Sequence, residues 1–313
     1  MVLRRLILPI LVFGGLAFVF FQKDAIYDWW RLRNYNPPAA ISRLTDRASF
    51  TDKAKHLFYI NHPKLVSSKK SFQAACTQTE QTIVLGCYIS PQLGITIYDV
   101  KDKRLNGVEE VTAAHEMLHA AYDRLSDKNR DKINKALNDY FKQELTDPRV
   151  KATIKSYQKT EPDDWVNEMH SVFATEIAYL PSSLESHFQQ YFKNRGQVVK
   201  LSERYEDAFR SREAKARQLL KQLKNLESDI SAVEADLKAE QADLSADRRS
   251  IDSQSEADAF NQRIQAYNAK VAHINSLVDR YNKLRLQYNE LVLQSRELFN
   301  AINTKSVESQ STQ

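Results

Sequence analysis

The feature that most restricts the fold is a pair of heptad repeats in the last third of the chain. Apolar side chains recur at a and d positions in two runs: Leu219, Leu223, Leu226, Ile230, Val233, Leu237 and Leu244, then Phe260, Ile264, Tyr267, Val271, Ile274, Val278 and Tyr281. Sustained heptads with charged flanks predict a coiled coil. The polar break at about 250–258 favours an antiparallel hairpin over 201–303, with arms of about 65–75 Å at 1.5 Å per residue. A single interrupted rod in a dimer is the alternative, and 304–313 is predicted to be a disordered tail.

The N-terminus carries a membrane signal. Arg4 and Arg5 precede an apolar run at 6–21, slightly shorter than the roughly 20 residues of a spanning helix. Because no A-x-A cleavage pattern follows, residues 1–22 are predicted to form a retained transmembrane anchor rather than a cleaved signal peptide. The short basic tail favours an inside N-terminus and an extracytoplasmic remainder, although further cations soon follow the run.

Residues 23–50 are predicted to be a juxtamembrane linker, with NPPAA at 36–40 as its clearest break. Tyr27, Trp29 and Trp30 follow the anchor directly, where aromatic side chains are typical of the membrane interface. The linker separates the anchor from a folded domain expected at 51–200.

Charge and cysteine content narrow the functional classes. The net charge of +5 is diffuse, and no basic patch interleaved with aromatic residues appears, so nucleic acid is not an expected partner. Cys76 and Cys87 are the only cysteines, and the ten residues between them could turn back so that they form a disulfide. Such a bond would require an oxidising compartment, in agreement with an extracytoplasmic domain. The alternative is two unrelated small core residues.

The domain at 51–200 is predicted to be α+β and mainly helical. Strand-like runs rich in β-branched and aromatic residues predict a small antiparallel sheet, with strands at 57–60, 82–89 and 95–100. From residue 108 the apolar period becomes helical. Capping residues and prolines divide this part into helices at about 108–125, 127–145, 147–159, 165–180 and 182–196.

The first of these helices contains the sequence HEMLH. His115 and His119, at i and i+4, lie on one helix face one turn apart, so their imidazoles can converge on one tetrahedral ion. Glu116 is rotated by about 100°, which suits a general base for a water activated by Zn²⁺. The alternative is an ordinary amphipathic helix in which the pattern arose by chance.

A second motif strengthens the metal hypothesis. The sequence WVNE at 165–168 places Glu168 on a later helix. An HExxH helix followed by a helix carrying Asn-Glu resembles the gluzincin zinc metallopeptidases, the thermolysin and aminopeptidase side of the zincins. The resemblance implies a zincin-like fold over about 56–196, zinc ligands at His115, His119 and Glu168, and a general base at Glu116.

The spacing departs from the familiar gluzincin pattern. Glu168 follows His119 by 49 positions instead of about 20, and Val172 stands where a carboxylate often orients a ligand histidine. Glu176 or His170 could therefore be the third ligand in place of Glu168. The metzincin pattern is excluded, because AAYDRL after His119 lacks its glycine and third histidine.

The resemblance also implies two further parts of a peptidase site. An edge strand, at 82–89 or 95–100, would pair with an extended substrate. A donor would stabilise the oxyanion, and Tyr157, Tyr179 and His187 are the candidates, with His187 preferred.

Two functions of different classes follow from these features. The first is a membrane-anchored zinc metallopeptidase that acts on a peptide or protein substrate. The second is an envelope scaffold in which the coiled coil binds a protein partner or self-associates, and the zincin-like module binds without catalysis.

Overall fold

The computed structural model describes residues 22–76 and 84–305, and within it the chain divides into two compact units. The first unit contains the described residues up to Glu206 together with those from Ala301 onward, and the second is Asp207–Asn300. The predicted anchor at 1–22 lies outside the described residues except for Gln22. Within the described ranges, no helix has the length and apolar character needed to cross a bilayer.

Three helices come first in the described part of the first unit, and most of the predicted linker at 23–50 is helical. They are α2 (Lys23–Leu32), α3 (Ala39–Arg47) and α4 (Asp52–Ile60). Ile41 and Leu44 of α3 are 2% and 4% exposed in the main core, so the folded unit begins before residue 51.

The predicted strand at 57–60 is also wrong, because these residues form the last turn of α4. Thr51 caps this helix by accepting a hydrogen bond from the amide of Ala54. As part of this helix, the side chains of Leu57, Phe58 and Ile60 are buried. Tertiary burial thus overrides the β propensity of these side chains.

The sheet has three strands in the order β1-β3-β2: β1 (Lys64–Val66), β2 (Gly86–Ile89) and β3 (Gly94–Tyr98). β2 and β3 form the predicted antiparallel pair, but β1 pairs with β3 in parallel, so the sheet is mixed. Helix α5 (Lys69–Ala75) follows β1. Cys76 and Cys87 form the predicted disulfide, which ties the end of α5 to β2.

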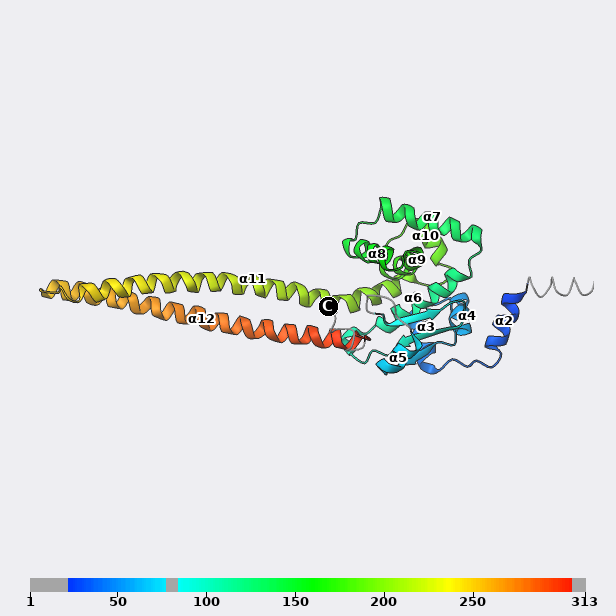
Figure 1. The fold of residues 1–313 in the computed structure, drawn as a ribbon, viewed down its shortest axis with the longest axis horizontal. Helices are drawn as coiled ribbons and strands as arrows, with labels where there is room; N and C mark the ends of the chain where they lie inside the picture. Colours follow the sequence, from blue (N-terminus) through cyan, green and yellow to red (C-terminus); the bar gives the residue numbers. More distant parts are fainter. Residues whose placement is uncertain (1–21, 77–83, 306–313) are drawn as a thin grey trace, which may run out of the picture. The chain divides into compact units, whose positions relative to one another are not determined.

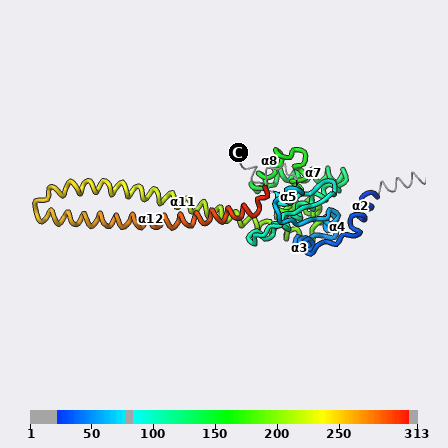
Figure 2. The backbone as a smooth tube through the Cα atoms, turned by 60° about the horizontal axis from the view of Figure 1, so that its bottom comes forward, coloured from blue at the N-terminus to red at the C-terminus, as the bar shows by residue number. Residues whose placement is uncertain are grey.

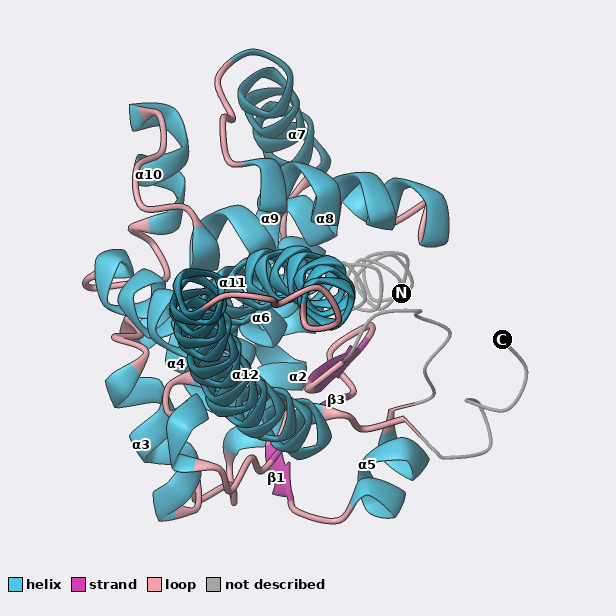
Figure 3. Ribbon diagram, turned by 90° about the vertical axis from the view of Figure 1, so that its left-hand side faces the viewer, coloured by secondary structure: helices cyan, strands magenta, loops and turns pink. Residues whose placement is uncertain are grey.

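The helices after residue 107 follow the predicted order. They are α6 (Val108–Asp123), α7 (Asp127–Gln143), α8 (Pro148–Thr160), α9 (Trp165–Glu176) and α10 (Ser182–Phe188), preceded by the 3-10 turn η1 (Lys103–Leu105). α9 ends four residues earlier than predicted, where Ile177 becomes extended, and α10 stops at Phe188. Helices α7 to α10 gather on one side of α6, and the sheet, α3 and α5 lie on the other (Figures 1 and 3).

The second unit is an antiparallel helical hairpin, as the heptads predict. Its arms belong to α11 (Arg195–Asp247) and α12 (Gln254–Ile302), which run side by side (Figure 2). Lys270 on α12 pairs with Asp236 and Glu240 on α11 at 2.7 Å. Nearer the turn, Arg263 pairs with Asp247, so residue numbers rise on one arm as they fall on the other.

The chain returns to the first unit after α12. Thr304 is fully buried there, and its hydroxyl donates to the carbonyl of Val84 at 2.8 Å. The prediction of a disordered tail is therefore wrong at residue 304, while 306–313 lie outside the described residues.

Candidate metal centre

Helix α6 supplies two of the three possible metal ligands. It begins after Gly107, whose φ of 112° lies in the left-handed region that favours glycine. Ala114, Leu118 and Ala121 form a buried stripe that fixes the rotation of the helix. His115 and His119 lie beside this stripe, and their ring centroids are 4.7 Å apart.

Helix α9 brings the third ligand. The Oε2 atom of Glu168 lies 3.2 Å from Nε2 of His115, and its Oε1 atom lies 3.3 Å from Nε2 of His119. Ligand atoms of the three side chains all lie within 4.8 Å of one another. Two ligands bound to a tetrahedral zinc at about 2.0–2.1 Å are separated by about 3.3 Å. The three side chains are therefore spaced as the ligands of a metal ion would be.

The charges of the cluster are strongly coupled. Burial alone would lower the pKa of His115, but the hydrogen bond and charge of Glu168, with Glu116 and Glu176, outweigh it and raise that pKa to about 9. Burial alone would raise the pKa of Glu168, but His119 and His115 hold it at about 2. The shifts in both pKa values favour a charged histidine beside a charged Glu168, so a metal ion would have to displace a proton on binding.

Glu168 has two polar neighbours, of which Tyr157 bonds to it and Asp164 bonds to the adjacent Asn167. Tyr157 on α8 hydrogen-bonds to the carboxylate of Glu168. Asp164 accepts 3.2 Å hydrogen bonds from the amide of Asn167, and burial raises its pKa. Glu161, Asp164 and Glu168 form a second group whose oxygens lie within 4.8 Å of one another.

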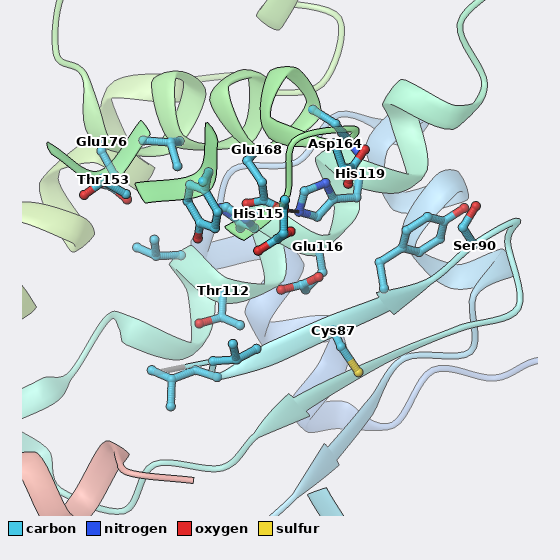
Figure 4. A pocket seen from close by; sticks show the side chains of 18 of the residues that line it. Cys87, Ser90, Thr112, His115, Glu116, His119, Thr153, Asp164, Glu168 and Glu176 are labelled. Carbon is cyan, nitrogen blue, oxygen red and sulfur yellow. Dashed lines mark hydrogen bonds and ion pairs between the residues drawn. The ribbon is translucent and has the colours of Figure 1, made fainter. Parts of the chain in front are cut away.

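The cluster lies in a cleft of about 480 Å³ between the helices and the sheet (Figure 4). His115, His119 and Glu168 converge on the side of α9, while Glu116 points toward the strand side of the cleft. Glu116 is 6% exposed. Strand β2 approaches so closely that a Cβ on Gly86 would lie 2.7 Å from Oε1 of Glu116. The cleft thus has a metal-ligand wall and a strand wall, with Glu116 between them.

Glu176 and His170, the alternative candidates for the third metal ligand, both have other partners. Glu176 lines the cleft but is engaged by Arg149 at 2.6 Å. His170 is fully buried and turns to His187, with their Nε2 atoms 2.9 Å apart. Neither belongs to the groups of described residues that could hold a metal, so Glu168 fits best as the third ligand.

His187, the preferred candidate for the oxyanion donor, does not line this cleft. It lines a separate cavity of about 360 Å³, where burial, Lys53 and Lys132 lower its pKa to about 4. Tyr179 is 89% exposed and also lies outside the cleft lining. Of the three predicted donors, only Tyr157 lines the cleft.

The sequence predicts the strand at 82–89 as a candidate substrate platform but not the role of Gly86 within it. Gly86 approaches Glu116 only because β2 packs across α6 in the folded unit. No pattern in the sequence near Gly86 predicts this packing. Tyr205 also lines the cleft from the first turns of α11, within the range 201–303 that is predicted to belong to the hairpin. The Asp164–Asn167 pair was the more visible omission, since it adjoins the WVNE motif.

Comparison with protein-family models, curated proteins and solved structures finds no match to this chain. The functional argument therefore depends on the residues and the geometry described above.

Proposed function

We propose that this protein is a membrane-anchored zinc metallopeptidase that hydrolyses peptide bonds in the cleft of the first unit. The observation that carries the proposal is the convergence of His115, His119 and Glu168 within 4.8 Å, beside a buried Glu116. This is the ligand set and base that the gluzincin resemblance implies, although the spacing between the motifs is longer than usual. A purely structural metal site has no need of the Glu116 carboxylate.

The cleft residues have separable tasks in this proposal. His115, His119 and Glu168 hold the zinc, which when bound would activate a water and polarise the scissile carbonyl. Glu116 accepts the proton of the attacking water and passes it to the departing amine. Tyr157 lines the same cleft and donates its hydroxyl to Glu168, so it would serve as the oxyanion donor by exchanging that bond for one to the substrate.

Strand β2 is the candidate platform for the substrate. Within the described part of the chain it pairs only with β3, so it is an edge strand. Two residues of β2, Cys87 and Tyr88, line the cleft, and so do Val84 and Leu85 just before the strand. An extended peptide that added to this edge would run past Glu116 and the metal ligands. The central strand β3, the other sequence candidate, is already paired on both sides.

The decisive experiment compares Glu116→Gln with Glu109→Gln. Both glutamates lie on α6, but Glu109 does not line the cleft. Purified full-length protein should bind one zinc per chain and cleave an unstructured protein. Glu116→Gln should keep the zinc and lower cleavage by about 10²–10⁴, the usual contribution of a general base. Unchanged cleavage in Glu116→Gln would exclude the mechanism, and Glu109→Gln should behave as the parent.

The scaffold function is the second candidate, and the long helices of the second unit favour it. α11 has 53 residues and α12 has 49, far more than a peptidase site requires. X-ray absorption of the zinc-loaded protein separates the two functions. Four protein ligands and no open position would favour the scaffold, and three protein ligands with a solvent oxygen would favour the peptidase.

A further inference from the structure

Helix α2 has two chemically different faces. The inner face is bonded to the rest of the first unit: Tyr27 donates to the carbonyl of Gln92 at 2.8 Å, and Asp28 accepts from Arg124 at 2.6 Å. Arg31 on the same face donates to the carbonyl of Ile60 at 2.7 Å. These bonds fix which side of α2 turns away from the domain.

The outer face combines large apolar side chains with cations. Ile26, Trp29 and Trp30 are 44%, 65% and 53% exposed. At 100° per residue, Lys23 and Arg33 fall on the same side of the helix, one near each end. The guanidinium of Arg33 lies 5.8 Å from the ring centre of Trp29.

The carboxylates of α2 lie on the opposite side. Asp24 and Asp28 both reach Arg124 on α6, at 3.6 and 2.6 Å. The outer face therefore carries apolar and positive groups without a carboxylate. Tryptophan flanked by basic side chains is the composition of helices that lie in the headgroup region of an anionic bilayer.

The residues that precede α2 in the sequence indicate that lipid, rather than a second protein, contacts its outer face. The apolar run at 6–21 ends immediately before Gln22, where α2 begins one residue later. If the apolar run at 6–21 spans a bilayer, as the proposed function requires, that bilayer holds the residues next to α2, and a protein partner would have to compete with it for this face. Lipid is therefore a better match than a second protein.

We propose that α2 lies flat on an anionic lipid surface, with Ile26, Trp29 and Trp30 inserted at the headgroup level and Lys23 and Arg33 near lipid phosphates. This contact is additional to the predicted anchor, and it differs from an aromatic belt around the anchor because Tyr27 turns inward to Gln92. Since α2 is bonded to the domain, the contact fixes the orientation of the first unit on the membrane. α2 lies at the edge of that unit beside α4 (Figure 1).

The chain is suited to a direct optical test. It contains three tryptophans, Trp29, Trp30 and Trp165. Trp165 packs against the core of the first unit and serves as an internal reference. The full chain is reconstituted in vesicles of phosphatidylcholine and phosphatidylglycerol in which one lipid carries bromine either high or deep in its acyl chains. Bromine quenches a tryptophan only on contact.

Bromine placed high in the acyl chains should quench the emission more strongly than bromine placed deep. The quenched fraction should be at most about two thirds, because two of the three tryptophans lie on α2. The double variant Trp29→Phe, Trp30→Phe should leave only the unquenched Trp165 signal, and its circular dichroism should match the parent. Arg33→Glu should weaken the quenching in anionic vesicles, whereas Arg43→Glu, an exposed cation on α3, should not.

Emission that lipid bromine leaves unchanged, but aqueous iodide quenches, would overturn the proposal. So would quenching by deep bromine alone, which would place the tryptophans inside the bilayer rather than at its surface. Protection from both quenchers would assign the face to protein contacts. None of these readouts depends on zinc or on cleavage, so the proposal and the peptidase function fail separately.

Discussion

Replacing Gly86 by alanine tests how the strand wall positions the general base. A Cβ at this position would lie 2.7 Å from Oε1 of Glu116 and 2.5 Å from Cγ2 of Thr112, where ordinary contacts are 3.4 Å or longer. Relief of the Glu116 contact requires a shift of about 0.7 Å and relief of the Thr112 contact about 0.9 Å, so β2 or these side chains must move by that amount. Gly86 itself has no positive φ, so the effect is steric and not conformational.

The magnitude follows from the sensitivity of catalysis to such a shift. A misplacement on the order of 1 Å costs about 10²-fold in rate, or about 2.7 kcal/mol of transition-state stabilisation. Gly86→Ala should therefore lower kcat by about that factor. Zinc content should stay at one per chain, because His115, His119 and Glu168 lie on the other wall of the cleft.

Gly94→Ala is the matched control, since Gly94 opens the neighbouring strand and its added Cβ would meet nothing closer than 3.8 Å. The assay measures kcat and KM on an unstructured protein, with zinc content and thermal melting in parallel. Full kcat in a folded, zinc-loaded Gly86→Ala protein would refute the idea that β2 sets the position of Glu116.

Three further predictions concern protons and the disulfide. Because His115 of the metal-free protein has a pKa of about 9, zinc uptake near neutral pH should release a proton. Apparent zinc affinity, measured by chelator competition, should then rise with pH up to about 9 and level off. The pKa of Glu109 is raised to about 7 by burial and Asp99, so the folded state binds the extra proton, and stability should fall as pH rises from about 4.5 to 7. Denaturant titrations of Glu109→Gln should lose that slope. Replacing both Cys76 and Cys87 by serine should cost about 3 kcal/mol, the chain-entropy value for a loop of this length, with β2 the first element to exchange amide hydrogens.

The features that could be predicted from the sequence are those set by local periodicity. The heptads predict both arms of the hairpin because a coiled-coil seam depends only on spacing along the helix. The separation of His115 and His119 is equally local, since residues four apart meet on any α-helix. Glu168 required the second motif, because a separation of 49 positions from His119 is compatible with many folds.

The wrong sequence predictions concern features of the structure that are determined by packing between residues far apart in the chain. Residues 57–60 have strand propensity, yet the Thr51 cap and the core on one side of α4 make them helical. His187 sits on an amphipathic helix whose facing partner, His170, could not be known in advance. Gly86 was missed because a glycine becomes informative only when the group opposite it is identified.

The two walls of the cleft differ in how they are held, and this separates metal binding from cleavage. The ligand wall consists of α6 and α9, packed directly on each other, so its geometry is that of two rigid helices. The strand wall depends on distant segments: the disulfide of Cys87, the bond from Thr304 to Val84, and pairing with β3. Loss of any of these contacts should loosen β2, and with it the position of Gly86 beside Glu116, while the metal ligands stay in place. Zinc content therefore depends on the ligand wall alone, whereas kcat depends on both walls. A variant that retains zinc but no longer cleaves the substrate is expected to be altered in the strand wall.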